Sequence, residues 1–198
     1  MPRIRTTLAV LALLALGGTT VALAEPGRAG AGDHGDSSGE GHHGKRDRLA
    51  TATLRNAAGE KVGRVQMRER RRGGVVLVVA RVHGLAPGFH GFHIHTTGRC
   101  DAPKFTTAGG HFNPAGATHN AHAGDLPSLL VSANGRAMLA TATDRFSLAD
   151  LRDADGSAVM VHSGPDNFAN IPPRYGTPDQ ETLNTGDSGS RVACGVVR

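Results

Sequence analysis

The sequence predicts an all-β fold: an eight-stranded antiparallel Greek-key barrel or sandwich with two long functional loops. Short segments with β-branched residues recur along the chain from residue 48, and Gly, Asn and Asp residues separate them. No segment shows a long helical pattern of apolar residues. Two long connections, at residues 96–127 and 163–190, interrupt this rhythm, and loops of that length in compact domains are usually functional.

Eight segments have the length and composition of strands. Turn-forming dipeptides punctuate them, including Ala58-Gly59, Gly73-Gly74, Asn134-Gly135 and Asp155-Gly156. The expected strands are Leu49–Leu54, Lys61–Met67, Val75–Val82, His90–His95, Ser128–Val131, Ala137–Thr143, Ala158–His162 and Arg191–Val197.

Histidine is the unusual feature of the composition. The chain has 198 residues, which suggests one domain with extensions, and it carries 11 His, 2 Cys and a net charge of +5. Its mixture of 20% charged and 38% hydrophobic residues excludes a wholly disordered chain, and two cysteines exclude a disulfide-rich mini-scaffold. Eleven histidines in a chain of this size point to metal binding.

The first 24 residues have the pattern of a secretory signal peptide. Arg3 and Arg5 precede an apolar run at residues 8–16, and Ala22-Leu23-Ala24 supplies the small residues of a cleavage site. We therefore expect export to the cell envelope or the extracellular space, with cleavage after Ala24. The alternative is a transmembrane anchor, although the strongly apolar part is shorter than the ~20 residues that span a bilayer.

Residues 25–47 are expected to form a disordered tether ahead of a folded domain at residues 48–198. The tether is rich in Gly, Asp, Ser and His and has no apolar periodicity. Its histidines, His34, His42 and His43, could bind metal loosely, while the simpler interpretation is a solvated spacer.

A run of charged residues, Arg68-Glu69-Arg70-Arg71-Arg72, precedes Gly73-Gly74. In an exported protein this run is more consistent with the tip of a hairpin than with a nucleic-acid site, so no nucleic-acid partner is expected. A weak contact with an anionic cell surface is a second interpretation. Self-association as a homodimer is the other partnership considered.

The main group of histidines begins at His93-Ile94-His95. Alternate residues of a strand point to one face, so both imidazoles can reach a single ion. Imidazole suits copper and zinc among other transition metals, and histidines with one carboxylate also suit tetrahedral zinc. The other potential ligands follow along the chain: His111, His119, His122, Asp125 and His162.

Five motifs together resemble the copper/zinc superoxide dismutase family. The resemblance covers roughly residues 48–198, follows the family's order and includes both of its cysteines. Each motif alone would be weak, whereas the set is highly specific. The motifs are Gly91-Phe92-His93-Ile94-His95, Gly109-Gly110-His111-Phe112-Asn113-Pro114, Gly124-Asp125-Leu126-Pro127, Val161-His162 and Gly189-Ser190-Arg191-Val192-Ala193-Cys194-Gly195.

The resemblance implies two metal sites that share one histidine, His111, which would also take part in catalysis. Arg191 would bind the anionic substrate, and His90 and Asp166 would support the ligands without holding metal. Cys100 and Cys194 would form a disulfide, which export permits. The implied copper ligands are His93, His95, His111 and His162, and the implied zinc ligands are His111, His119, His122 and Asp125.

The chain departs from the family pattern in the zinc loop. Many members separate the second and third zinc ligands by more than the three-residue step from His119 to His122. A helical turn would place His119, His122 and Asp125 on one side and complete the site. The alternative is that the shortened loop has lost the site and that one histidine is exposed. Asn184 stands where many eukaryotic relatives carry a lysine, so binding of the anion is expected to depend more on Arg191.

The activity that the resemblance implies is dismutation of superoxide to oxygen and hydrogen peroxide. A redox-cycling copper ion would exchange the electrons, and zinc would support the bridging histidine. Two other functions are considered. One is a copper-binding or copper-delivery module without turnover, which the His-rich tether favours, and the other is a purely structural β-domain, which leaves the histidine spacing unexplained.

Overall fold

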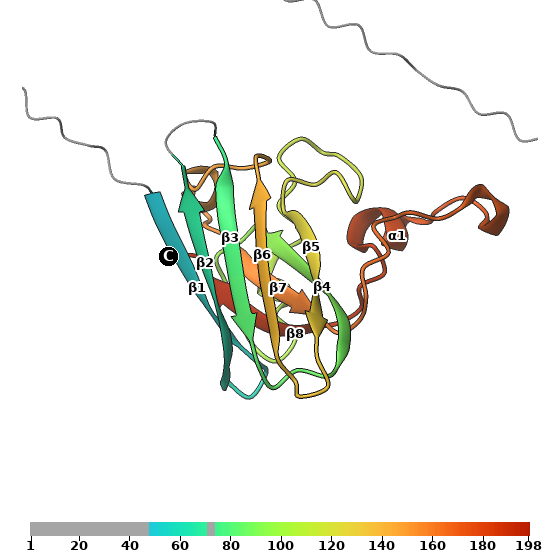
Figure 1. Cartoon of the computed structure of the whole chain (residues 1–198). Helices are drawn as coiled ribbons and strands as arrows, with labels where there is room; N and C mark the ends of the chain where they lie inside the picture. Colours follow the sequence, from blue (N-terminus) through green and yellow to red (C-terminus); the bar gives the residue numbers. More distant parts are fainter. Residues whose placement is uncertain (1–47, 71–73) are drawn as a thin grey trace, which may run out of the picture. The chain divides into compact units, whose positions relative to one another are not determined.

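The computed structural model describes residues 48–70 and 74–198. Within them, eight strands form one antiparallel sheet that nearly closes into a barrel (Figure 1). The strand order is β5-β4-β7-β8-β1-β2-β3-β6, and β5 also contacts β6 across the remaining seam. Strands β3 and β6 are neighbours, as are β4 and β7, so the chain crosses over between distant strands as in a Greek key. The predicted fold class is confirmed.

All eight expected strands are present, with differences at their ends. Strand β5 differs most, because it begins at Asp125 rather than at Ser128: Asp125 and Leu126 already pair with His93 and Phe92 of β4. The strands are β1 (Arg48–Arg55), β2 (Lys61–Glu69), β3 (Val76–Val82), β4 (Gly88–His95), β5 (Asp125–Val131), β6 (Ala137–Thr143), β7 (Ala158–His162) and β8 (Arg191–Val196).

The helical segments are short. One α-helix, α1 (Gln180–Thr185), begins where the Asp179 carboxylate accepts the Thr182 N–H at 2.9 Å and ends at Gly186, which adopts left-handed backbone angles. No helix in the described residues is long and apolar enough to cross a membrane. The 3₁₀ turns are η1 (Thr106–Ala108), η2 (Asp150–Arg152) and η3 (Pro173–Tyr175).

From His90 to His95, strand β4 is buried on both faces, and this burial determines where the histidines lie. Phe92 and Ile94 belong to the apolar core inside the barrel. His93 and His95 alternate with them and therefore point to the outer face, yet both are fully buried. The long connections 96–124 and 163–190 cover that face, the second of them carrying α1 (Figure 1).

The described part of the charged run, Arg68 to Arg70, lies at the end of the β2–β3 pair, which agrees with the predicted hairpin. Strand β2 pairs with β3 up to Glu69 and Val76, and the Arg70 N–H donates to the Val75 carbonyl at 2.9 Å. Residues 71–73 lie outside the described residues, as do the predicted signal peptide (1–24) and tether (25–47).

A disulfide joins Cys100 to Cys194. It connects the first long loop to strand β8, and it packs in a small apolar cluster that includes Phe105 and Met160. The predicted pairing is confirmed, and the bond ties the loop over the outer face to the barrel.

We expect replacement of both cysteines by serine to lower the free energy of unfolding by about 2–5 kcal/mol, because the bond closes a long loop of the unfolded chain. The two residues are 94 positions apart. Urea unfolding of the wild-type protein and the Cys100→Ser/Cys194→Ser variant measures the difference. Two free thiols in denatured, unreduced wild-type protein would contradict the bond.

Candidate metal centre

The candidate site lies on the outer side of strands β4 and β7. His93 and His95 come from β4, and His162 comes from the end of β7, where it pairs with Arg191 of β8. His111 comes from the first long loop and forms an isolated bridge with His95. Main-chain pairing therefore fixes the positions of all these residues.

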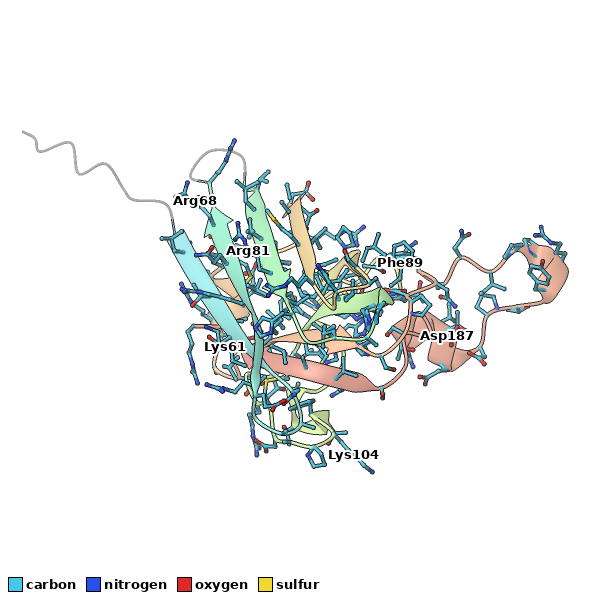
Figure 2. The ribbon with its side chains drawn as sticks, turned by 60° about the horizontal axis from the view of Figure 1, so that its bottom comes forward. Lys61, Arg68, Arg81, Phe89, Lys104 and Asp187 are labelled. Atoms are coloured by element: carbon cyan, nitrogen blue, oxygen red, sulfur yellow. A yellow bond between two sulfur atoms is a disulfide. The ribbon has the colours of Figure 1, made fainter. Side chains whose placement is uncertain are left out.

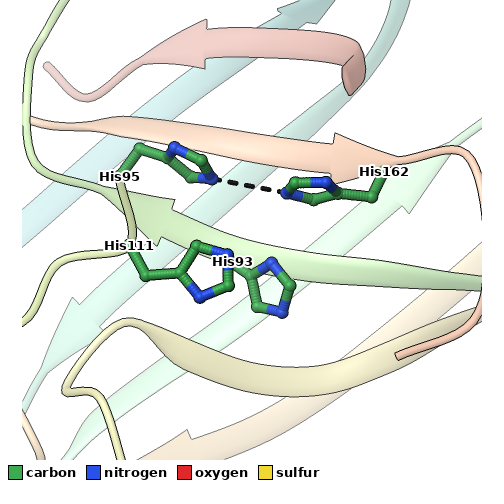
Figure 3. Close-up of side chains that lie close together, drawn as sticks. All are labelled: His93, His95, His111 and His162. Carbon is green, nitrogen blue, oxygen red and sulfur yellow. Dashed lines mark hydrogen bonds between the residues drawn. The ribbon is translucent and has the colours of Figure 1, made fainter. Parts of the chain in front are cut away.

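Four imidazoles form the first cluster (Figure 3). They belong to His93, His95, His111 and His162, all buried, and one nitrogen from each lies within 4.8 Å of the others. His95 Nε2 lies 3.4 Å from His162 Nε2, and the ring centroids of His93 and His111 are 3.9 Å apart. These are the four copper ligands that the resemblance implies, and the structure brings them together.

Protein acceptors occupy one nitrogen in three of these rings and leave the other for the cluster. His95 Nδ1 lies 2.9 Å from the Gly109 carbonyl, and His162 Nδ1 lies 3.0 Å from the Gly189 carbonyl. His93 Nε2 lies 2.7 Å from Asp166 Oδ2, while His93 Nδ1 is buried without a hydrogen-bond partner.

The second cluster is formed by His111, His119, His122 and Asp125. The Asp125 carboxylate lies 2.9 Å from His111 Nδ1, 3.1 Å from His119 Nδ1 and 3.3 Å from His122 Nδ1. The remaining nitrogen of His111, Nε2, is buried without a hydrogen-bond partner. His111 thus offers Nδ1 to this cluster and Nε2 to the first one.

The loop that carries His119 and His122 reaches this arrangement without a helical turn, so the predicted helical turn is wrong. Residues 118–125 form successive turns, in which Ala121 N–H donates to Thr118 and Asp125 N–H donates to His122. His119 N–H instead donates to the Leu183 carbonyl of α1 at 2.8 Å, so a distant segment anchors the chain here. The alternative of an exposed histidine is also wrong, because His119 and His122 are each 4% exposed.

Asp166 connects the two clusters. Its side chain is fully buried, and its two oxygens lie 2.7 Å from His93 Nε2 and 2.8 Å from His119 Nε2. The Phe168 N–H also donates to this carboxylate. Gly186 packs directly over the pair, and a Cβ atom there would collide with Asp166 and His119. Only glycine suits this close approach with a φ of 59°.

His90 supports the site through a contact with the main chain at the end of strand β7. Its Nδ1 lies 2.7 Å from the main-chain carbonyl of His162, and its Nε2 lies 2.8 Å from that of Ala86. The imidazole therefore braces the end of β7, where His162 points into the first cluster.

Arg191 borders a cavity of about 440 Å³ in front of the first cluster, where His95, His111 and His162 also line the wall. Its guanidinium donates to the Phe105 carbonyl at 2.7 Å and to the Gly109 carbonyl at 2.6 Å. Burial lowers the pKa of Arg191, but a guanidinium remains charged at neutral pH. The cavity therefore holds a fixed cation beside the imidazoles.

Burial determines the charge of the first cluster. Removal from water lowers the pKa of His93 to about 4 and that of His162 to about 3, and the pKa of His95 lies well below its usual value. These imidazoles are neutral at pH 7, which is the form that binds metal ions.

The carboxylates determine the charge of the second cluster. Burial opposes protonation of His119, but hydrogen bonds to Asp125 and Asp166 outweigh it and raise the pKa of His119 to about 9. Burial likewise opposes ionisation of Asp166 and Asp125, and their histidine partners hold both pKa values below the usual range. A metal ion entering this cluster displaces the proton of His119.

Both clusters fit metal ions. Four clustered imidazoles, with His93 Nδ1 and His111 Nε2 buried and unpartnered, are a donor set for copper. Three histidines and one aspartate are a donor set for tetrahedral zinc.

Sequence reasoning identified Asn184 at this site but missed two other residues of the cavity wall. Glu181 and Thr185 of α1 line the cavity together with Asn184 and Arg191. Their signal was present in the chain: Asp179 as an N-cap and Gly186 as a C-terminal stop bracket a six-residue helix. The segment is too short to show apolar periodicity.

Comparison with known proteins identifies the family. Residues 61–197 match the family described as "Copper/zinc superoxide dismutase (SODC)". Superoxide dismutase [Cu-Zn] of Mycobacterium tuberculosis is 48% identical over 140 residues, covering 62% of this chain and 58% of that protein. Extracellular superoxide dismutase [Cu-Zn] of Onchocerca volvulus is 35% identical, covering 81% of each chain. The crystal structure of a SOD-like protein from Bacillus subtilis is 30% identical with a TM-score of 0.61, covering 74% of this chain and 96% of that chain.

We expect the metal-free protein to be most stable near pH 6.5. Below that pH the unfolded chain binds protons at His93 and His162 that the folded chain excludes, so the free energy of unfolding falls as the pH falls towards 4. Above it the folded chain keeps a proton on His119 that the unfolded chain releases, so stability falls as the pH rises towards 9. Each unmatched proton contributes a slope of about 1.4 kcal/mol per pH unit.

Urea unfolding of chelator-treated protein at a series of pH values measures this profile. The His119→Gln variant is the control, because it should lose the decline above pH 6.5. A wild-type stability that stays constant or rises from pH 6.5 to 9 would contradict the assignment of the proton to His119.

Proposed function

This chain belongs to the copper/zinc superoxide dismutase family, and on that premise we propose that it converts superoxide to oxygen and hydrogen peroxide. One observation carries the proposal: the two nitrogens of His111 face two separate donor clusters, beside a cavity that holds Arg191. The matched region spans 58% of the length of the Mycobacterium tuberculosis relative, which is named a superoxide dismutase.

The two metal ions would occupy the two donor sets. Copper would be held by His93, His95, His111 and His162, and zinc by His111, His119, His122 and Asp125. Bound copper would alternate between Cu(II) and Cu(I), taking an electron from one superoxide ion and giving it to a second. Zinc, which has no redox chemistry of its own, would keep the His111 ring in place.

Arg191 would bind the substrate anion. Two carbonyl contacts use part of its guanidinium, and its other N–H groups remain for a ligand in the cavity. The Gly109 carbonyl links the Arg191 guanidinium to the first cluster. It accepts a hydrogen bond from Arg191 and also lies 2.9 Å from His95 Nδ1. The cation therefore cannot shift without disturbing a member of the first cluster.

His111 would donate one of the two protons that superoxide takes up when it is reduced to hydrogen peroxide, and the other would come from solvent in the cavity. Its Nδ1 is held by Asp125 at 2.9 Å, and its Nε2 faces the first cluster without a hydrogen-bond partner. An imidazole in this position can hold a proton on Nε2 and donate it to a species bound in the cavity.

We expect the Arg191→Ala variant to keep its copper and to lose about tenfold or more in kcat/KM, because the cavity loses its fixed cation. The wild-type rate should also fall with increasing ionic strength, since salt screens the attraction of an anion. Superoxide consumption by metal-loaded protein and metal content by mass spectrometry are the two measurements.

Arg81→Ala, which removes an exposed arginine on strand β3, is the matched control and should keep the wild-type rate (Figure 2). Loaded wild-type protein that holds copper without consuming superoxide would support the copper-binding module instead. An Arg191→Ala variant with wild-type kcat/KM and salt dependence would remove the role of Arg191 alone.

A homodimer is proposed through the outer face of strands β4 and β5. Phe89 (labelled in Figure 2) and Leu130 lie directly opposite each other across these strands. Their side chains are 56% and 57% exposed. We expect Phe89→Asp to shift the protein to monomer, whereas Met138→Asp, at a somewhat more exposed apolar position on β6, should not. Sedimentation velocity measures both, and a wild-type protein that stays monomeric at high micromolar concentration would contradict the interface.

Three further proposals rest on the sequence. The first is the division of the chain: export with cleavage after Ala24, then a tether at residues 25–47 and a folded domain at residues 48–198. The second is a weak contact of the arginine run with an anionic surface. The third is that no nucleic acid binds. The Onchocerca volvulus relative is named extracellular, which supports export.

A further inference from the structure

Arg145 lies outside every motif of the family resemblance, yet its side chain contacts the loop that carries two candidate zinc ligands. Its Nη1 donates to the Asn120 carbonyl at 2.8 Å and to the His122 carbonyl at 3.3 Å. Asn120 directly follows His119, so both contacts fall on the short stretch that sets the spacing of His119 and His122.

Arg145 is itself held in place by the barrel. It follows strand β6, and its N–H donates to Thr143 Oγ1 at 3.2 Å. The next residue, Phe146, is 3% exposed in the apolar core. The guanidinium therefore extends from a fixed point of the barrel to the loop.

Other contacts also hold this part of the loop, and one of them is the bond between the buried His119 ring and Asp166 at 2.8 Å. In the described residues, the main-chain bond that links residues 118–121 to another element is the one from His119 to Leu183. Apolar packing does not replace such bonds, because a hollow of about 380 Å³ lies between the loop and strand β6, bordered by Asn120, Asp125 and Arg145. Arg145 forms part of the wall of this hollow and makes charge-assisted bonds to the loop.

We propose that Arg145 is a positioning residue for zinc: it sets the main-chain path between His119 and His122 so that both Nδ1 atoms face Asp125. The proposal rests on the zinc assignment of the proposed function. The shortened loop makes such a brace necessary, because the segment has no helix of its own to fix the spacing of the ligands.

The proposal separates the two metals. Three copper ligands, His93, His95 and His162, belong to strands, and the fourth, His111, is bridged to His95. The main-chain positions of these four residues do not depend on the path of residues 119–122, and the link that remains between the clusters is Asp166, which contacts both His93 and His119. Loss of Arg145 should therefore weaken zinc binding much more than copper binding.

The test is the zinc dissociation constant of full-length, copper-loaded protein, measured by competition with a chromophoric chelator. We expect Arg145→Ala to bind zinc about 10- to 100-fold more weakly, as is typical when a residue that orients a metal ligand is removed. Arg145→Lys keeps a charged donor and should recover part of the loss. Arg136→Ala, at the opposite end of β6, removes the same charge and should match the wild type.

Thermal unfolding provides the second readout. The metal-free melting temperature of Arg145→Ala should stay close to that of the wild type, while the increase caused by added zinc should shrink. Equal zinc affinity in Arg145→Ala and wild type would overturn the proposal, and so would parallel losses of zinc and copper. If the wild-type protein takes up copper but no zinc when zinc is in excess, both the zinc site and this proposal are wrong. The titration of the wild type alone distinguishes that outcome from a failure of the Arg145 proposal.

Discussion

The carboxylate of Asp166 fixes which nitrogen each of two histidines can present to a metal ion. An imidazole has two nitrogens, and a buried one needs a partner for each. Asp166 takes His93 Nε2 and His119 Nε2, so the Nδ1 atoms of both rings turn inward, one to each cluster. Because the carboxylate is buried, losing either histidine would leave one of its oxygens without a hydrogen-bond partner, and the two clusters are therefore coupled through a single side chain.

A second chain of contacts places the cation. The Cys100–Cys194 bond ties the first long loop to β8, and Phe105 packs beside it in the same small cluster. The carbonyls of Phe105 and Gly109 then accept from Arg191, which also belongs to β8. Gly109 in addition contacts His95. The disulfide thus acts on function through geometry, because it holds the acceptors that orient the arginine.

The sequence predicted the strands well and the loops poorly, for a physical reason. Strand residues such as His93 and His95 obey a local rule, since alternation alone puts both on one face. The positions of His119 and His122 depend on Leu183, Asp166 and Arg145, none of which is near them in the chain. The three-residue spacing of His119, His122 and Asp125 predicted a helical turn there. Hydrogen bonds to residues far away in the sequence hold the segment in successive turns instead.

The same contrast explains how a shortened loop can keep a complete donor set. A long loop can fix its ligands with secondary structure of its own, whereas this one has turns only. Its spacing is therefore imposed from outside by three elements: α1 through Leu183, the second long loop through Asp166, and the end of β6 through Arg145. Each contributes one or two hydrogen bonds, worth about 0.5–1.5 kcal/mol for neutral pairs and more where a charge takes part. Ligand geometry in this protein is accordingly a property of the closed barrel and both loops together.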